Sequence, residues 1–222
     1  RFSFPTPRAV RRLTMMVDQG VLAAESLESL EIGGWLLRAD PEQVLELLSR
    51  LSRAPSVRFS LLAQLSHFSD RKEVFADALQ ASWLEVMPQA LNQHARWAWE
   101  QTGFKLARAH GQEVAGRLTA LLLLLRDEVP DAVLTVFEQL VNTAPDAAWG
   151  AFATTLESSA ESAQALCVQF RSHMPVAVLG PQIMAWVARD LERARLAALL
   201  VSDIAEDTLA SHLLSQFEDP VI

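Results

Sequence analysis

The sequence predicts an all-α protein built from stacked antiparallel helical hairpins. Apolar residues recur at intervals of three and four, as in Val44, Leu45, Leu48 and Leu51, which is the spacing of one helix face. No segment alternates strictly between polar residues and strand-forming residues, and the chain contains no tyrosine. Prolines precede many of the amphipathic segments, as expected when proline occupies the first turn of a helix.

Proline and glycine mark the expected helix ends in the first half of the chain. Pro41 and Pro55 each precede an amphipathic segment, and Asp40 is expected to cap the helix that follows it through its carboxylate. Glycines end helices because they adopt left-handed backbone angles without strain, so Gly20, Gly33 and Gly34 are expected to lie at helix ends. The predicted helices are 7–19, 21–31, 41–53, 56–67, 70–80, 82–93 and 95–110.

The same signals divide the second half. Pro130, Pro145 and Pro181 are expected to start helices, and Gly111 and Gly180 to mark ends. Asp131 and Asp146 place negative charge in a first turn, where the helix dipole favours it. The predicted helices are 112–127, 131–142, 146–158, 162–172, 181–189, 191–204 and 206–217.

One phrase occurs twice within residues 129–156, VPDAVLTVFEQLVNTAPDAAWGAFATTL. Pro130 and Phe137 correspond to Pro145 and Phe152, an interval of fifteen residues. That interval fits one helix plus a tight turn, and two such helices make a hairpin of the size found in stacked helical repeats. The rhythm resembles that of the HEAT and armadillo α-solenoids, although no signature of one repeat family is present. A compact multi-helix bundle is the alternative.

Length and composition favour a single helical-repeat domain over residues 1–222. Because the sequence begins at Arg1 without methionine, we expect it to be part of a longer chain. No uninterrupted apolar run is longer than that of residues 120–125, which is much shorter than the roughly 20 residues that span a bilayer, so no membrane span is expected. The single cysteine, Cys167, forms no intramolecular disulfide and is expected in the core, which favours an intracellular, cytoplasmic protein.

The charge is unevenly distributed. The net charge of −8 disfavours binding of nucleic acid, whose affinity depends on lysine and arginine. Residues 127–170 contain seven acids and no lysine or arginine, whereas residues 1–12 contain four arginines and no acid. Such runs are typical of solvated faces, and the alternative is a partner-binding surface.

No catalytic, cofactor-binding or metal-binding motif was found. The chain has no phosphate-binding glycine loop and no paired metal-ligand motif, and its five histidines are far apart in sequence. In the pair His67 and Asp70, helix capping by Ser69 or Asp70 is the simpler explanation, and the pair Asp207 and His212 lacks a third group. The sequence therefore predicts a protein that is not an enzyme and needs no cofactor or metal.

Residues 92–111, NQHARWAWEQTGFKLARAHG, carry two stripes at helical spacing. The first stripe is assigned to the core and consists of Leu91, Ala95, Trp99, Thr102, Leu106 and Ala109. The second consists of Trp97, Gln101, Phe104 and Arg108, flanked by Lys105. Aromatic and cationic groups on one face can anchor a partner, and the alternative is a helix that is buried on two sides.

Two functions therefore stand as hypotheses from the sequence, with simple self-association as a third. The first is a non-catalytic scaffold that binds protein partners, with contact residues Trp97, Phe104, Lys105, Arg108, Glu138 and Glu157. The second is a nucleic-acid-binding HEAT-like domain that uses a local arginine-rich groove formed by Arg50, Arg53, Arg58, Arg96 and Arg108.

Overall fold

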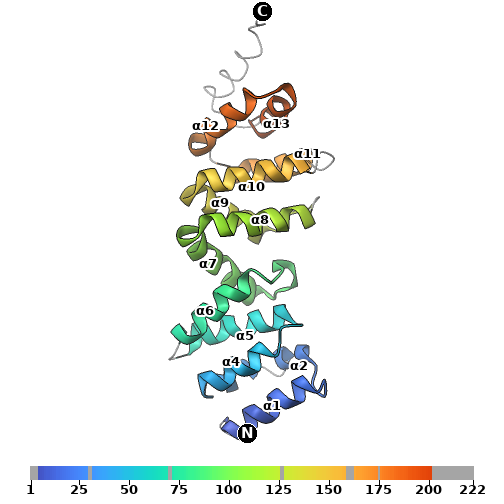
Figure 1. Cartoon of the computed structure of the whole chain (residues 1–222), viewed down its shortest axis with the longest axis vertical. Helices are drawn as coiled ribbons and strands as arrows, with labels where there is room; N and C mark the ends of the chain where they lie inside the picture. Colours follow the sequence, from blue (N-terminus) through green and yellow to red (C-terminus); the bar gives the residue numbers. More distant parts are fainter. Residues whose placement is uncertain are drawn as a thin grey trace, which may run out of the picture. The chain divides into compact units, whose positions relative to one another are not determined.

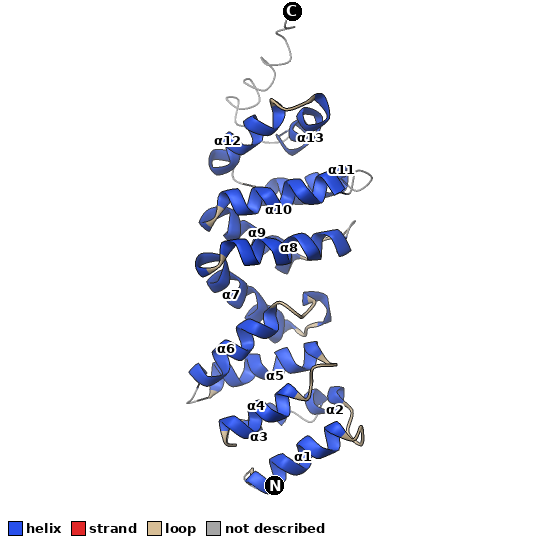
Figure 2. Cartoon of the chain, in the orientation of Figure 1, coloured by secondary structure: helices blue, strands red, loops and turns tan. Residues whose placement is uncertain are grey.

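The described part of the chain is entirely helical. In the computed structural model, the residues described are 5–29, 32–69, 72–125, 128–158, 163–174 and 176–201. These residues form thirteen α-helices and two short 3₁₀-helices, and no strand occurs among them (Figure 2). The predicted all-α class is confirmed for this part of the chain.

The chain divides into two compact units between Thr102 and Gly103, a position inside helix α7. In the first unit, α5 packs along α6 and also contacts α2 and α3, while α1 packs against α4 (Figure 1). The helices of this unit are α1 (Pro7–Asp18), α2 (Ala24–Ser29), α3 (Ile32–Leu36), α4 (Pro41–Ser49), α5 (Pro55–Phe68), α6 (Lys72–Trp83), the 3₁₀-helix η1 (Pro88–Ala90) and the first part of α7 (Gln93–Ala109).

A stacked pair of indoles lies in the core of the first unit. Trp83 and Trp99 are fully buried, and their ring centroids are 4.8 Å apart with an interplanar angle of 22°. The Trp83 Nε1–H donates a hydrogen bond of 2.9 Å to the Trp99 carbonyl oxygen. A buried indole loses less free energy when its N–H finds an acceptor, so this bond fixes the end of α6 against the middle of α7.

In the second unit, α10 is the most connected helix. It packs against α8, α9, α11 and α12, while α13 packs against α11 and α12. The helices that begin in this unit are α8 (Gly111–Leu125), α9 (Asp131–Thr143), α10 (Pro145–Ser158), α11 (Ala163–Phe170), the 3₁₀-helix η2 (Arg171–His173), α12 (Val176–Val187) and α13 (Leu191–Val201).

The repeated phrase forms the hairpin that its spacing predicts. Pro130 directly precedes α9, Pro145 is the first residue of α10, and only Ala144 lies between the two helices. Phe137 and Phe152 are both buried, with ring centroids 6.2 Å apart, so the two copies meet in the core.

Two proline junctions share one backbone geometry. Ala54, before Pro55, has φ −130° and ψ 66°, and Ala144, before Pro145, has φ −147° and ψ 68°. The proline ring excludes the residue before it from the α region. Each proline therefore keeps the preceding residue out of the helix and starts the next one, and Pro41 likewise opens α4.

Several predicted helix ends were wrong. The segment 82–93 is not a helix: α6 ends at Trp83, and Pro88, which lacks an N–H, starts a short 3₁₀-helix instead. Pro181 does not start a helix but lies inside α12, together with Gly180. Gly33 and Gly34 lie within α3, a helix that the sequence analysis missed. The predicted helix 206–217 lies outside the described residues.

Of the other predicted helix-end residues, some were confirmed and one made no capping hydrogen bond. Gly20 has φ 67° and follows α1, which confirms it as a helix end. Asp40 is the N-cap residue of α4 but makes no side-chain capping hydrogen bond, so that part of the prediction was wrong. Gly111 starts α8 at a close approach, because a Cβ there would lie 2.7 Å from the Cβ of Ala144.

Candidate functional site

Four rings from two helices gather on the first unit. His67 and Phe68 end α5, while His94 and Trp97 lie in the first two turns of α7; we call these four residues the ring cluster. The His67 ring centroid lies 4.6 Å from that of Phe68 and 5.9 Å from that of Trp97, in edge-to-face arrangements. The His94 ring stacks with Phe68 at 6.1 Å and with Trp97 at 6.4 Å.

The ring cluster is largely exposed. Phe68 is 60% exposed and Trp97 is 49% exposed, and His67 is exposed as well. Exposed apolar side chains that occur singly need no explanation, whereas a contiguous group of them is typical of an interaction site. Phe68 and Trp97 are joined through the rings of His67 and the half-buried His94, and this group is the feature of the first unit that points most directly to binding.

An open cavity of about 510 Å³ adjoins the ring cluster. Its volume falls within the range of roughly 300 to 1,000 Å³ that is common for ligand pockets. Helix α3, helix α5 and the start of α7 supply its walls, and we call it the α3–α5–α7 groove. The lining residues are Gly33, Gly34, Leu37, Gln64, Phe68, Asn92 and His94.

Two local features position the walls of this groove. The Asn92 side-chain oxygen accepts a hydrogen bond of 2.9 Å from the Ala95 N–H, which caps the start of α7 and so sets the direction in which His94 and Trp97 leave the helix. Gly33 allows Gln64 to lie directly against α3, because a Cβ at residue 33 would come within 1.8 Å of the Gln64 side-chain oxygen.

The predicted partner stripe on α7 is partly exposed. Trp97, Lys105 and Arg108 are exposed, whereas Gln101 and Phe104 are half-buried. Trp97 belongs to the first unit and contacts His67 and His94, while Phe104, Lys105 and Arg108 belong to the second. Of the residues assigned to the core stripe, Ala109 is exposed and the others are buried.

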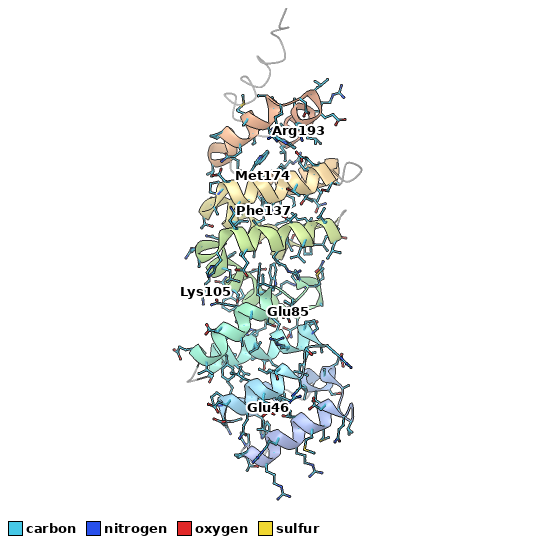
Figure 3. The ribbon with its side chains drawn as sticks, in the orientation of Figure 1. Glu46, Glu85, Lys105, Phe137, Met174 and Arg193 are labelled. Carbon is cyan, nitrogen blue, oxygen red and sulfur yellow. The ribbon has the colours of Figure 1, made fainter. Side chains whose placement is uncertain are left out.

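The predicted acidic contact residues have partners within the chain. In the second unit, the Glu138 carboxylate lies 3.2 Å from His173 Nδ1, linking α9 to η2. Glu157 accepts hydrogen bonds from Arg193 Nε at 2.9 Å and from Arg193 Nη2 at 2.8 Å, and one of 3.4 Å from Trp186 Nε1. Arg193, labelled in Figure 3, extends from α13 and also pairs with Asp190.

These contacts change the proton affinity of the groups involved. Hydrogen bonding from Arg193 holds the pKa of Glu157 below its ordinary value, with a smaller contribution from Trp186, while desolvation opposes both. The backbone N–H of Arg193 likewise lowers the pKa of Asp190. Stabilisation of a charged carboxylate by hydrogen bonds makes it a weaker base, so Glu157 stays ionised as a link between α10 and α13, and Asp190 stays ionised at the start of α13. They line a second cavity, of about 370 Å³, with Arg193.

The predicted arginine groove contains several arginines with partners. Arg50 lies 3.8 Å from both Asp18 and Glu46, and Arg58 lies 3.2 Å from Glu85. Arg96 Nη2 donates to the Leu91 carbonyl oxygen at 3.4 Å. Arg53 and Arg108 are exposed and belong to the first and second unit, respectively. Pairing with carboxylates lowers the positive charge that Arg50 and Arg58 offer to a phosphate backbone.

Cys167 is a core residue, as the sequence predicted. The side chain is fully buried, and desolvation raises the pKa of its thiol to about 12. A thiol that stays protonated is a poor nucleophile and a poor metal ligand. Among the residues that the structure describes, no three or more histidine, cysteine, aspartate or glutamate side chains gather as a metal site. Asp70, Asp207 and His212 lie outside the described residues.

Of the ring cluster, the sequence predicted Trp97 as a contact residue but not His67, Phe68 or His94. Residues 94 and 97 are three apart on one helix, a spacing that places both side chains on one face. Their contact with His67 and Phe68 depends on how α5 and α7 pack, and no spacing along the chain reports that. The sequence signal for an exposed aromatic residue was the pair His67 and Phe68 directly before Ser69. A phenylalanine in the last turn of a helix has fewer neighbouring residues to cover it.

No helix in the described part of the chain is both long enough and apolar enough to cross a membrane. No family model matches the sequence, and neither a curated protein nor a solved structure matches it. The residues themselves therefore carry the functional interpretation.

Proposed function

We propose that the chain is a non-catalytic helical-repeat scaffold that binds a segment of another protein. In this proposal, hairpins such as α9–α10 stack side by side as in an α-solenoid, and successive helices offer a continuous binding face. The observation that carries the proposal is the ring cluster, in which His67, Phe68 and Trp97 are exposed and His94 is half-buried. Tryptophan and other large aromatic residues dominate the binding energy of many protein interfaces.

The predicted contact residues support this function to different degrees. Trp97 is exposed and contacts His94, which lines the α3–α5–α7 groove, and Lys105 and Arg108 are exposed on the same helix. Glu138 and Glu157 have internal partners, so a partner protein would have to compete with His173 and Arg193 for them. We therefore centre the proposal on Trp97 and its neighbouring rings.

Selection from a random peptide display library, with the whole chain immobilised, tests the proposal. We expect peptides that bind the wild-type chain and lose at least about tenfold in affinity against Trp97→Ala, the loss of a typical interface hot spot. The control variant is Val74→Ala, which removes another exposed apolar side chain of the first unit. Enrichment of no peptide above a control protein would contradict the proposed function.

The nucleic-acid hypothesis has less support. Arg50 and Arg58 are paired with carboxylates, and the net charge of −8 opposes association with a polyanion. Nucleic-acid binding remains the alternative function, and a direct measurement of binding to nucleic acid distinguishes it from the scaffold function.

A further inference from the structure

We propose that His67 and His94 together bind a divalent transition-metal ion of the kind that imidazole ligands prefer, such as Cu²⁺, Ni²⁺ or Zn²⁺. This inference goes beyond the proposed function and does not depend on it. It rests on the spacing of the two rings, on the absence of other polar partners for them in the described part of the chain, and on the residues that surround them.

The two imidazole rings come from different helices and are spaced for one shared ion. His67 is in the last turn of α5, His94 is in the first turn of α7, and their ring centroids are 6.1 Å apart. A ligating imidazole nitrogen lies about 2.0 to 2.1 Å from the metal, which places the ring centroid about 3.2 Å from it. Two rings on one ion are therefore separated by about 4.5 Å when their bonds to the metal are perpendicular and by about 6.4 Å when they are opposite.

The observed separation falls within that range, so one ion fits between the rings without a change in how α5 and α7 pack. The orientation of each ring is adjustable, because rotation about the Cβ–Cγ bond of histidine is broad. This rotation turns a ring nitrogen toward the ion and hardly moves the ring centroid. His67 is exposed, so its ring has room to turn.

Neither histidine has a polar partner for its side chain among the described residues. The His67 side chain forms no hydrogen bond or ion pair with them, and His94 Nε2 is buried without a hydrogen-bond partner. His173, by contrast, has its Nδ1 3.2 Å from the Glu138 carboxylate. A buried polar atom without a partner destabilises a fold. A bound ion removes this cost, because the unprotonated imidazole nitrogen donates its lone pair to the metal.

Phe68 and Trp97 hold the two histidines near each other. The Phe68 centroid lies 4.6 Å from that of His67 and 6.1 Å from that of His94. The Trp97 centroid lies 5.9 Å from that of His67 and 6.4 Å from that of His94. Ligands that are already packed in place lose less conformational entropy when they bind, and an apolar surrounding limits the access of water to the ion.

The donor set selects the class of metal. An ion reaches His94 from the α3–α5–α7 groove, and no aspartate or glutamate lines this groove. Ca²⁺ and Mg²⁺ require several oxygen ligands, chiefly carboxylates, whereas imidazole suits Zn²⁺, Ni²⁺ and Cu²⁺. Within the described ranges no third histidine, cysteine, aspartate or glutamate joins the pair, so the remaining coordination positions are left to water.

Calorimetric titration of nickel chloride into the whole, untagged chain tests the inference. We expect a single strong Ni²⁺ site, tighter binding of Cu²⁺ and no binding of Ca²⁺. His67→Ala and His94→Ala should each weaken Ni²⁺ binding at least about tenfold, because each removes one of two protein ligands. His110→Ala, which removes an exposed histidine of the second unit, should keep the wild-type affinity. If His94→Ala does not fold, His67→Ala still tests the site at an exposed position.

Tryptophan fluorescence locates the ion. Bound Cu²⁺ quenches a tryptophan that lies close to it, and the Trp97 ring contacts both histidines. We expect Trp97→Phe to lose most of the quenching at saturating Cu²⁺. Trp149→Phe, at a half-buried tryptophan of the second unit, should keep it.

Three outcomes would overturn the inference. The first is wild-type affinity for Ni²⁺ in both His67→Ala and His94→Ala. The second is an equal loss of affinity in His110→Ala, which would mean adventitious binding to scattered histidines. The third is equal quenching by Cu²⁺ in the wild type and in Trp97→Phe. Peptide selection in the presence of a chelator measures the scaffold function separately, so either proposal can fail without the other.

Discussion

At the scale of single residues, three phenylalanines hold the helices of the second unit together. Phe170 on α11 lies 4.7 Å from Phe137 on α9 and 5.3 Å from Phe152 on α10, measured between ring centroids. All three side chains are buried. Phe137 and Phe152, which belong to the repeated phrase, therefore both contact Phe170, which lies outside it.

Truncation of one of these rings should weaken the unit strongly. We expect Phe137→Ala to lower the free energy of unfolding by about 3 to 5 kcal/mol, because it removes a large buried ring and leaves a cavity. Phe68→Ala, at an exposed phenylalanine, is the control and should change it by less than about 1 kcal/mol. Urea denaturation measures both. Equal effects of the two substitutions would contradict the assigned core.

The carboxylate of Glu157 links α10 to α13 through Arg193. Its lowered pKa means that folding favours the ionised form, so this contribution to stability is complete above the ordinary pKa of 4.5 and is lost as the pH falls through the lowered value. Asp190 has the same sign, relative to its ordinary pKa of 3.8. Both groups therefore destabilise the fold in acid.

Removal of Arg193 should reduce this acid sensitivity. We expect the melting temperature of Arg193→Met to be lower than that of the wild type at neutral pH and to fall less steeply below pH 4.5, the ordinary pKa of Glu157. Arg195→Met, an exposed neighbour on α13, should keep the wild-type slope. Scanning calorimetry across that range measures the difference, and parallel curves for wild type and Arg193→Met would refute the linkage.

At the scale of elements, proline has two roles in this fold. Before or at the first position of α4, α5, α9 and α10, it starts a helix, as the sequence predicted. In α12 it lies within the helix, where residue 181 has no N–H to donate to the carbonyl four residues earlier. Helix α12 nevertheless continues through this position, and it packs on α9, α10 and α13.

Replacement of the internal proline should therefore stabilise α12. We expect Pro181→Ala to raise the free energy of unfolding by about 1 to 3 kcal/mol, because it restores a backbone hydrogen bond. Pro145→Ala is the comparison and should lower it by less than about 1 kcal/mol, since a preset first turn is lost. Thermal unfolding followed by circular dichroism compares the two. A loss of stability in Pro181→Ala would mean that the proline shape is required there.

Helix α7 shows how far the candidate site could be read from the sequence. Its periodicity assigned Trp99 and Leu106 to the core and Trp97 to another face, and the burial of these residues agrees. The same periodicity left open whether the second face is buried or exposed, because a helix pattern does not report which neighbours cover it. The structure shows that Trp97 is exposed and that its ring contacts His67 at the end of α5.

At the scale of the whole molecule, charge separates the two hypotheses for function. The sequence carries 27 acidic residues against 19 lysines and arginines. Such an excess repels polyanions at long range, and only a dense local group of cations overcomes it. The arginines proposed for that group are divided between the two units, and two of them are paired with carboxylates.

We therefore expect no measurable binding of the whole chain to single- or double-stranded DNA at about 0.15 M salt. Electrophoretic mobility shift against a random-sequence oligonucleotide measures this, with heparin as a second polyanion. Binding that weakens steeply with added salt, and that disappears in Arg53→Glu, would instead support the arginine groove.

The sequence alone determined the helical class, the hairpin at the repeated phrase and the burial of Cys167, because each follows from local periodicity or from proline geometry. The tertiary structure decided which helix faces stay uncovered. It brought His67 and Phe68 against His94 and Trp97, opened a groove over Gly33 and Gly34, and paired Glu157 with Arg193. The reason is physical: periodicity records which residues share a face of one helix, whereas contacts between helices depend on packing between segments far apart in the chain.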